Sequence, residues 1–214
     1  MLHNNKIARE VAKGLLDIQA VRLNPSQPFT WASGMKSPIY CDNRKTLAYP
    51  AIRSQIRQGF VEMIQQYFPS VNLIAGVATG AIAQGALVAD SLELPYVYVR
   101  DKPKAHGMGN VIEGHIAGGE KAVVVEDLIS TGGSSLKAVE ALRAAGVEVL
   151  GLVAIFTYSF KEAEERMQQA QVPFYTLSDY PTLIQYAAEA QAVQPSAVET
   201  LMKWYENPSV WITT

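Results

Sequence analysis

The chain has 214 residues, of which 49% are hydrophobic and 18% charged, and its formal net charge is −2. This balance predicts one compact cytoplasmic domain, and it excludes the overall basic character that marks most nucleic-acid-binding proteins. No apolar run approaches the ~20 residues of a membrane span, and Cys41 is the only cysteine, so an internal disulfide is impossible.

The first part of the chain predicts two helices with short strands between them. Apolar residues at helical spacing predict an amphipathic helix over 6–20. Residues 27–49 combine aromatic and β-branched side chains with Gly34 and Pro38, which favours two short strands around a turn. Pro50 suits the first turn of a second helix.

From residue 71 onward, strand and helix patterns alternate. Strands are predicted over 73–77, 96–99, 121–126, 147–156 and 174–177. Helices are predicted after most of them, and Gly146 suits the left-handed cap of the helix over 135–145. The last predicted elements are two packing helices within 181–206. This alternation predicts an α/β fold with a mostly parallel sheet covered on both faces.

Three polar segments follow predicted strands, namely 78–81, 100–110 and 126–134. Ligands of parallel sheets bind outside the carboxyl ends of the strands. We therefore expect the three segments to converge on one crevice.

The most informative segment is 122–134, where a β-branched run ends in Glu126 and Asp127 and a loop of hydroxyl residues and glycines leads into a helix. Two carboxylates can accept hydrogen bonds from a sugar diol. Backbone N–H groups at a helix N-terminus suit a phosphate. The order lacks the Gly-Lys-Ser/Thr ending of a P-loop and the glycine spacing of a dinucleotide site. It therefore predicts a site for a phosphorylated ribose.

This segment resembles the phosphoribosyl diphosphate (PRPP) motif of type I phosphoribosyltransferases. The resemblance implies the fold of that family, a mostly parallel central sheet flanked by helices with a small N-terminal hood. It also implies that Glu126 and Asp127 hold the ribose 2′- and 3′-hydroxyls and that 130–134 wraps the 5′-phosphate. The implied PRPP-binding segment consists of Glu126, Asp127, Leu128, Ile129, Ser130, Thr131, Gly132, Gly133 and Ser134.

A second constellation is cationic. Arg100, Lys102, Lys104 and His106 lie within seven residues and are followed by Gly107, so the loop suits a diphosphate. The spacing of Arg, Lys, His and Gly resembles the catalytic loop of the orotate phosphoribosyltransferase family. The resemblance implies that Arg100, Lys104 and His106 bind PRPP, act in catalysis, and close over the neighbouring subunit's site in a homodimer. Asp101 departs from members with a second lysine there, so pyrophosphate binding would rely more on Lys102 or Lys104.

A third segment, 29–44, resembles the part of that family's hood that holds orotate. The matching residues are Ser33, Gly34, Ser37 and Pro38. Some members carry a lysine where this chain has Ala32, so we hypothesise that Lys36 or Arg44 faces the orotate carboxylate. The implied orotate-binding set is Ser130, Lys36, Tyr40 and Arg44.

The resemblance extends from about residue 5 to 190. It implies a single phosphoribosyltransferase domain over 1–214, with a hood of about 1–48 plus the C-terminal helices and a core of about 50–180. It implies that PRPP and orotate are converted to orotidine 5′-monophosphate and diphosphate. Mg²⁺ is expected on PRPP oxygens and water, with no metal site built from protein ligands alone.

Two alternatives stay open from the residues. One is a phosphoribosyltransferase for a purine or uracil, against which the hood and cationic loop argue. The other is a PRPP-sensing regulator that binds RNA or DNA, which would need a basic surface or an added domain. The net acidic chain favours the enzyme, and we expect neither a nucleic-acid nor a membrane partner.

Overall fold

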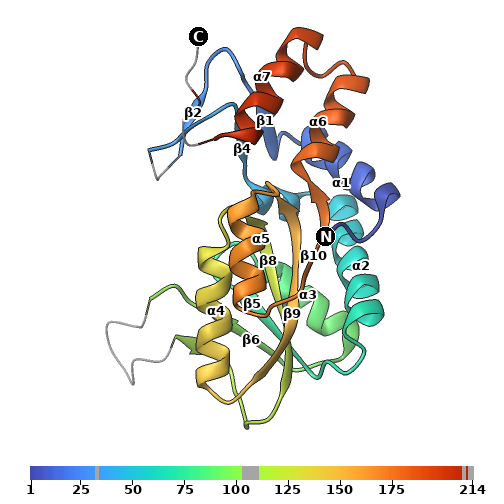
Figure 1. The fold of residues 1–214 in the computed structure, drawn as a ribbon. Helices are drawn as coiled ribbons and strands as arrows, with labels where there is room; N and C mark the ends of the chain where they lie inside the picture. Colours follow the sequence, from blue (N-terminus) through green and yellow to red (C-terminus); the bar gives the residue numbers. More distant parts are fainter. Residues whose placement is uncertain (32–33, 103–110, 209–210, 212–214) are drawn as a thin grey trace.

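The computed structural model describes residues 1–31, 34–102, 111–208 and 211 (Figure 1). Its centre is a six-stranded sheet in the order β10-β9-β8-β5-β6-β7. Every neighbouring pair is parallel except β6–β7, so the predicted mostly parallel sheet is confirmed. The strands are β5 (Leu73–Val77), β6 (Tyr96–Val99), β7 (Ile112–Glu113), β8 (Lys121–Ile129), β9 (Glu148–Thr157) and β10 (Phe174–Asp179).

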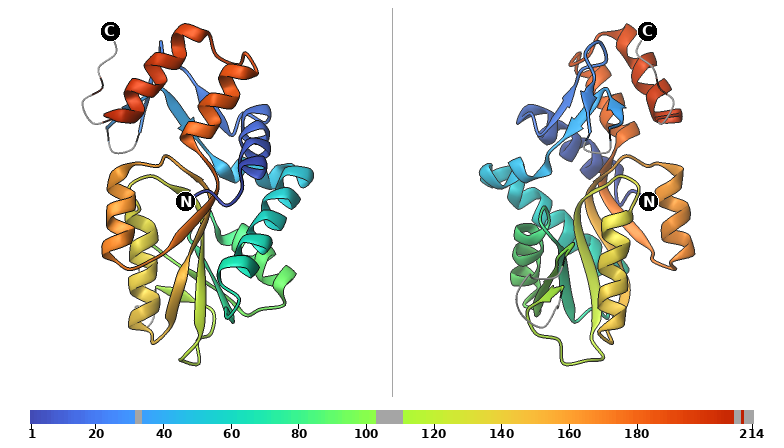
Figure 2. Two further views of the ribbon diagram at one scale, coloured as in Figure 1. Left: turned by 45° about the vertical axis from the view of Figure 1, so that its right-hand side comes forward. Right: turned by 90° about the vertical axis from the view of Figure 1, so that its left-hand side faces the viewer.

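Helices cover both faces of this sheet (Figures 1 and 2). Side chains alternate across a strand, so Val123 and Val125 of β8 belong to one core and Ala122 and Val124 to the other. The first core is completed by α1 (Asn5–Asp17), α2 (Pro50–Tyr67) and α3 (Ile82–Leu92). The second is completed by α4 (Gly133–Ala144) and α5 (Lys161–Gln169). Burial on both faces explains the near-continuous apolar strands of the sequence.

Above the sheet lies a smaller layer, called here the hood, which is built from residues 21–41 and 180–206 (Figure 1). Its strands form two antiparallel pairs, β1–β4 and β2–β3. The hood comprises β1 (Val21–Leu23), β2 (Phe29–Thr30), β3 (Lys36–Ser37), β4 (Ile39–Cys41), α6 (Tyr180–Glu189) and α7 (Pro195–Glu206). The six-residue 3₁₀ helix η1 (Asn43–Ala48) connects β4 to α2.

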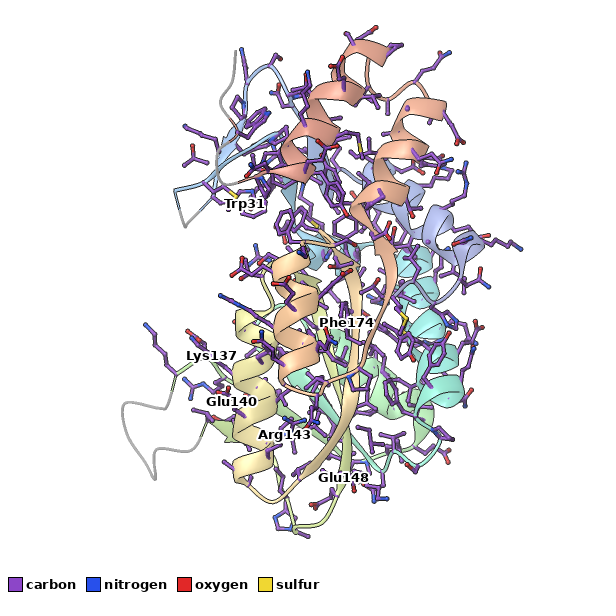
Figure 3. The ribbon with its side chains drawn as sticks, in the orientation of Figure 1. Trp31, Lys137, Glu140, Arg143, Glu148 and Phe174 are labelled. Carbon is purple, nitrogen blue, oxygen red and sulfur yellow. The ribbon has the colours of Figure 1, made fainter. Side chains whose placement is uncertain are left out.

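An aromatic cluster holds the hood together. Trp204 of α7 is fully buried, and its ring centre lies 5.8 Å from that of Trp31 and 5.9 Å from that of Tyr158. Its indole N–H also donates to the main-chain oxygen of Lys36 at 3.2 Å. Figure 3 shows Trp31 at the lower edge of the hood, facing the sheet layer. Residues far apart in the chain therefore pack together in the hood.

The helices and strands predicted from the sequence are found with boundaries shifted by a few residues, and Gly146 has the expected positive φ of 82°. Strands β1 and β7 and the 3₁₀ helix η1 were not predicted. Strand β8 also runs three residues further than predicted, because its pairing with β9 continues to Ile129↔Thr157 although its pairing with β5 ends at Gly76↔Val125. The acidic pair therefore lies within the strand. Among the described residues, no helix has the length and apolarity needed to span a membrane.

Candidate active site

The polar segments after β5, β6 and β8 meet at one edge of the sheet, as predicted for their described residues. The N–H of Ala78 donates to the carbonyl of Val99 at 2.8 Å. A β-carbon placed on Gly80 would lie only 2.2 Å from a carboxylate oxygen of Asp127. A small cavity between the segments is lined by residues that include Ala78, Arg100 and Ser134.

Glu126 is the more buried member of the acidic pair, with 3% of its surface exposed. One carboxylate oxygen accepts the N–H of Asp127 at 3.0 Å. The other accepts the hydroxyls of Ser134 and Ser135 at 3.3 and 3.0 Å. Burial, and then the charge of Asp127, raise the pKa of Glu126. Glu126 thus ties the end of β8 to the first turn of α4.

Asp127 lies closer to the surface and faces the loop after β5. Its carboxylate packs directly on Gly80, where only a glycine leaves room. Burial is the largest cause raising the pKa of Asp127, and the charge of Arg44 acts in the opposite direction. The main-chain carbonyl of Asp127 accepts a hydrogen bond from the side-chain amide of Asn43 at 2.6 Å. Asp127 therefore contacts both the loop after β5 that contains Gly80, called here the glycine loop, and the start of η1 at Asn43.

Residues 130–134, called here the phosphate loop, lead directly into α4. Gly132 caps this helix with a φ of 78°, a left-handed conformation that side chains rarely adopt. A guanidinium nitrogen of Arg166 in α5 donates to the main-chain oxygen of Thr131 at 3.4 Å. The N–H groups at the start of α4 and the positive end of its dipole form an anion-binding arrangement. Ile129 is fully buried, and its main-chain oxygen accepts the N–H of Tyr158 at 3.0 Å.

The described part of the cationic segment begins at Arg100, at the end of β6. Its guanidinium lies 3.3 Å from a carboxylate oxygen of Glu113 in β7, and its N–H donates to the carbonyl of Val111 at 2.8 Å. Asp101 pairs with Lys137 of α4 at 3.2 Å (Figure 3). The other predicted catalytic residues, Lys104 and His106, lie outside the described residues.

The three orotate-binding candidates of the hood occupy different places. The guanidinium of Arg44 hydrogen-bonds Asp42 at 2.7 Å. The pKa of Arg44 is raised chiefly by that bond. Arg44 directly follows Asn43, whose side chain reaches the main chain of Asp127. Tyr40 packs against Phe29, with ring centres 5.7 Å apart. The ammonium of Lys36 donates to the hydroxyl of Thr30 at 2.7 Å, within the β2–β3 hairpin.

A cavity of about 380 Å³ connects the hood to the phosphate loop. Its lining includes Met35 of the hood, Thr131 of the phosphate loop, Lys161 at the start of α5 and Tyr205 of α7. Its volume is in the range that binds small molecules. Ser130, the fourth orotate candidate, directly precedes Thr131 and is partly exposed.

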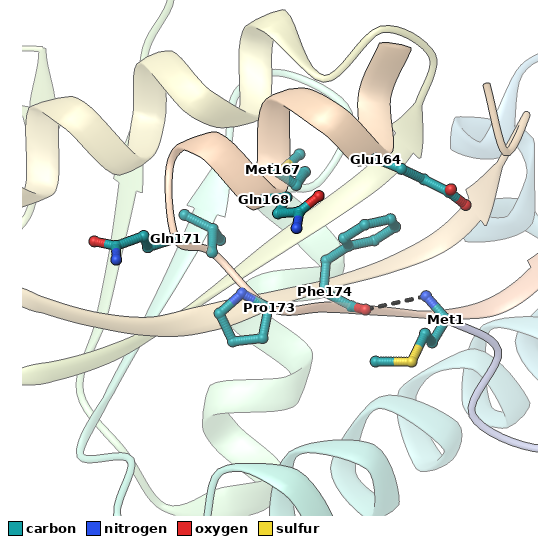
Figure 4. Close-up of a pocket in the computed structure, with 8 residues that line it drawn as sticks. Met1, Glu164, Met167, Gln168, Gln171, Pro173 and Phe174 are labelled. Atoms are coloured by element: carbon teal, nitrogen blue, oxygen red, sulfur yellow. Dashed lines mark hydrogen bonds between the residues drawn. The ribbon is translucent and has the colours of Figure 1, made fainter. Parts of the chain in front are cut away.

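A second pocket, of about 390 Å³, lies elsewhere (Figure 4). It opens between α5 and the first residue of the chain, where the Met1 ammonium donates to the carbonyl of Phe174 at 3.2 Å. Phe174 begins β10, so this pocket lies at the amino end of that strand. It is therefore not part of the crevice at the carboxyl ends.

Three contacts of this site were not foreseen from the sequence. Ser135 follows the predicted loop and holds Glu126, and Lys137 follows Ser134 by three residues on the same face of α4. Helical spacing after the loop could have indicated both. Asn43 reaches Asp127 across 84 residues, and no local pattern signals such a contact.

Comparisons with known proteins are consistent across the chain. The phosphoribosyl transferase domain family matches residues 43–186. A protein of Cytophaga hutchinsonii named orotate phosphoribosyltransferase is 55% identical over 203 residues, which are 95% of this chain and 97% of that protein. A protein of Staphylococcus saprophyticus with the same name is 53% identical, over 95% of this chain and its own full length.

Solved structures agree with these matches. The orotate phosphoribosyltransferase of Aeropyrum pernix superposes with a TM-score of 0.75 at 28% identity, covering 86% of this chain and 99% of that one. The UMP synthase of Leishmania donovani gives a TM-score of 0.80 at 26% identity, covering 93% of this chain. This chain spans 42% of the length of that larger protein.

Proposed function

The chain belongs to the orotate phosphoribosyltransferase family, and we propose that it transfers the 5-phosphoribosyl group of PRPP to orotate, giving orotidine 5′-monophosphate and diphosphate in pyrimidine biosynthesis. The observation that supports this function is that Asp127, Gly80 and the phosphate loop lie together at one edge of the sheet. The chain that carries them is 55% identical to a protein named orotate phosphoribosyltransferase. The arrangement offers separate places for a sugar diol, a diphosphate and a phosphate.

PRPP would bind with its ribose hydroxyls on the acidic pair. Asp127 is the more accessible carboxylate, and Glu126 is held by Ser134 and Ser135, so Asp127 makes the closer contact. The 5′-phosphate would lie at the start of α4, where main-chain N–H groups and the helix dipole favour an anion. Gly132 gives this loop its turn.

The chemistry is displacement of diphosphate from the anomeric carbon of the ribose. Negative charge grows on the departing diphosphate, so cations close to it stabilise the transition state more than the ground state. We assign Arg100, which lines the small cavity beside Ala78, to stabilise the departing diphosphate. Lys104 and His106 follow Arg100 in the sequence and are assigned the same role. Orotate presents a readily deprotonated ring nitrogen, so a strong general base is not required.

Mg²⁺ fits the donors that the site provides. Among the described residues, no group of three or more His, Cys, Asp or Glu side chains is placed to hold a metal ion. Mg²⁺ commonly uses one or two carboxylates together with substrate oxygens and water. Glu126 and Asp127 supply such hard oxygen donors. When bound, the ion would neutralise charge on the diphosphate.

Orotate would lie between the hood and the phosphate loop. The cavity of about 380 Å³ lined by Met35 and Thr131 supports this position. We assign Ser130, Tyr40, Lys36 and Arg44 to the orotate site. Arg44 is the stronger partner for the orotate carboxylate because it follows Asn43, which contacts Asp127, whereas Lys36 bonds Thr30 within the β2–β3 hairpin. We also assign the reaction to the cytoplasm, since both substrates are anionic metabolites.

The reaction is tested by following the absorbance of orotate after adding PRPP and Mg²⁺. Loss of orotate absorbance with release of diphosphate is expected. A panel of uracil, adenine, guanine and hypoxanthine serves as the control for base choice. Turnover of one of these bases in place of orotate would contradict the proposed substrate.

A homodimer that shares its active sites is the proposed assembly. The cationic segment would act on the neighbouring subunit, so the inactive variants Lys104→Ala and Asp127→Asn carry their defects in different halves of one site. Mixed dimers of the two variants should recover part of the activity, because one of their two sites is intact. Mixed dimers that stay inactive would argue against a shared site.

A further inference from the structure

The side chain of Asn43 occupies the junction between the hood and the acidic pair. Only 2% of this residue is exposed, and it begins η1, directly after the last hood strand. Its amide nitrogen donates to the main-chain carbonyl of Asp127 at 2.6 Å. Its amide oxygen accepts from the thiol of Cys41 at 3.3 Å. A main-chain carbonyl can only accept, so this orientation of the amide is the one that satisfies both partners.

The hydrogen bond to Asp127 replaces a missing strand contact. Pairing between β5 and β8 ends at Gly76↔Val125, so β8 continues past its neighbour before it reaches Asp127. A buried main-chain carbonyl without a donor is costly, and the Asn43 amide reaches it there. The backbone that carries the Asp127 carboxylate is therefore held by a residue outside the sheet.

Asn43 is itself held by a second layer of buried polar groups. Its main-chain carbonyl accepts from the hydroxyl of Thr46 at 2.6 Å. The same hydroxyl oxygen accepts from the amide of Gln84 at 3.3 Å. Gln84 belongs to α3, the helix that follows the loop containing Gly80. The network thus connects the two segments that face each other at Asp127 and Gly80.

The Cys41 thiol, which donates to the amide oxygen of Asn43, is held in its protonated form. Burial raises the pKa of the Cys41 thiol well above its usual range, and the charges of Asp127 and Asp42 add to the effect. The thiol therefore stays protonated and remains a donor. Cys41 donates to the side-chain oxygen of Asn43 and Thr46 to its main-chain carbonyl, so both the side chain and the backbone of Asn43 are held beside Asp127.

We propose that Asn43 is a positioning residue for phosphoribosyl transfer, which sets the Asp127 carboxylate at the ribose hydroxyls by holding the Asp127 main chain. This inference rests on the proposed function. It assigns Asn43 no contact with the substrate. The proposal has a specific consequence. Without the amide donor of Asn43, the site should lose its preference for a sugar with both ring hydroxyls, while the phosphate loop should still bind phosphate.

The test measures binding of ribose 5-phosphate and of 2-deoxyribose 5-phosphate by calorimetry. The wild-type protein is expected to favour the ribose compound by about tenfold or more, the usual value of one hydrogen bond to a charged group. Asn43→Ala should reduce this ratio to about two or less. The matched control is Asn24→Ala, because the Asn24 side chain caps a turn of the hood by accepting from Ser26 and Gln27 and, within the part of the chain that the structure describes, makes no hydrogen bond to the acidic pair. That variant should keep the wild-type ratio.

A general loss of structure would weaken both ligands alike and leave their ratio unchanged, so the ratio separates positioning from folding. If Asn43→Ala does not fold, Asn43→Asp replaces it, since it keeps the volume and the acceptor for Cys41 but lacks the N–H donor. A wild-type ratio in the folded variant would overturn the role of Asn43. Absence of orotate transfer by the wild-type protein would instead overturn the proposed function.

Discussion

Replacing Gly80 with alanine should damage PRPP use far more than it damages the fold. The added methyl carbon would lie 2.2 Å from one Asp127 carboxylate oxygen and 2.5 Å from the other. Non-bonded carbon and oxygen atoms need roughly 3.3 Å, so the carboxylate has to move by about 1 Å. The φ of Gly80 is not in the left-handed region, so alanine adds no backbone strain of that kind.

The cost of this shift can be bounded. A misplacement of about 1 Å at a reacting centre can reduce rate by about 100-fold. Loss of one hydrogen bond to a charged group corresponds to about 1.5–3 kcal/mol, or roughly 10- to 150-fold. We therefore expect kcat/KM for PRPP in Gly80→Ala to fall about 10- to 100-fold in the orotate absorbance assay, with a small change in melting temperature.

Gly14→Ala is the matched control. A methyl group there would meet Ile52 at 3.6 Å, an ordinary contact, inside helix α1 and away from the site. Alanine is favoured over glycine within helices by about 0.5–1 kcal/mol, so this variant should be slightly more stable with unchanged kinetics. A Gly80→Ala enzyme with wild-type kcat/KM for PRPP would refute the assignment of Asp127 as a ribose ligand held against Gly80.

Three further predictions concern the same structure. Burial raises the folded-state pKa of Glu126. The contribution of Glu126 to the stability of the folded protein is therefore fully present below the usual glutamate pKa, and it is lost as pH rises through the raised pKa. The melting temperature of ligand-free Glu126→Gln should therefore fall less with rising pH than that of the wild type, and parallel curves would contradict this. Arg44→Ala should raise the KM for orotate about tenfold, equal to about 1.4 kcal/mol, and Lys36→Ala should raise it less. If both variants keep the wild-type KM, neither residue binds the orotate carboxylate. Trp204→Ala should cost about 3–5 kcal/mol in denaturant unfolding because it leaves a cavity among the hood aromatics, and a loss below 1 kcal/mol would show that the cluster does not hold the hood.

Local patterns in the chain were sufficient for the fold class and for placing the acidic pair next to the phosphate loop. The alternation of apolar strands and amphipathic helices indicates a parallel sheet, because each pattern reflects burial of neighbouring residues. The sequence of Glu126, Asp127 and the hydroxyl-rich loop also carries its chemistry locally, since strand end, turn and helix start are consecutive in the chain. The parallel strands of the sheet and the helices that cover it were predicted within a few residues for this reason, whereas the two-residue strand β7 was not.

Contacts between distant residues came only from the tertiary structure. The close packing of Gly80 on Asp127 and the hydrogen bond from Asn43 to Asp127 join segments dozens of residues apart. Trp31 and Trp204 meet in the hood although they lie near opposite ends of the chain. Such contacts depend on how distant elements pack against one another. A contact between two distant residues leaves no period or spacing in the sequence around either of them. The chain by itself therefore specified which groups could bind a phosphorylated ribose, whereas the folded structure decided how those groups are held in place.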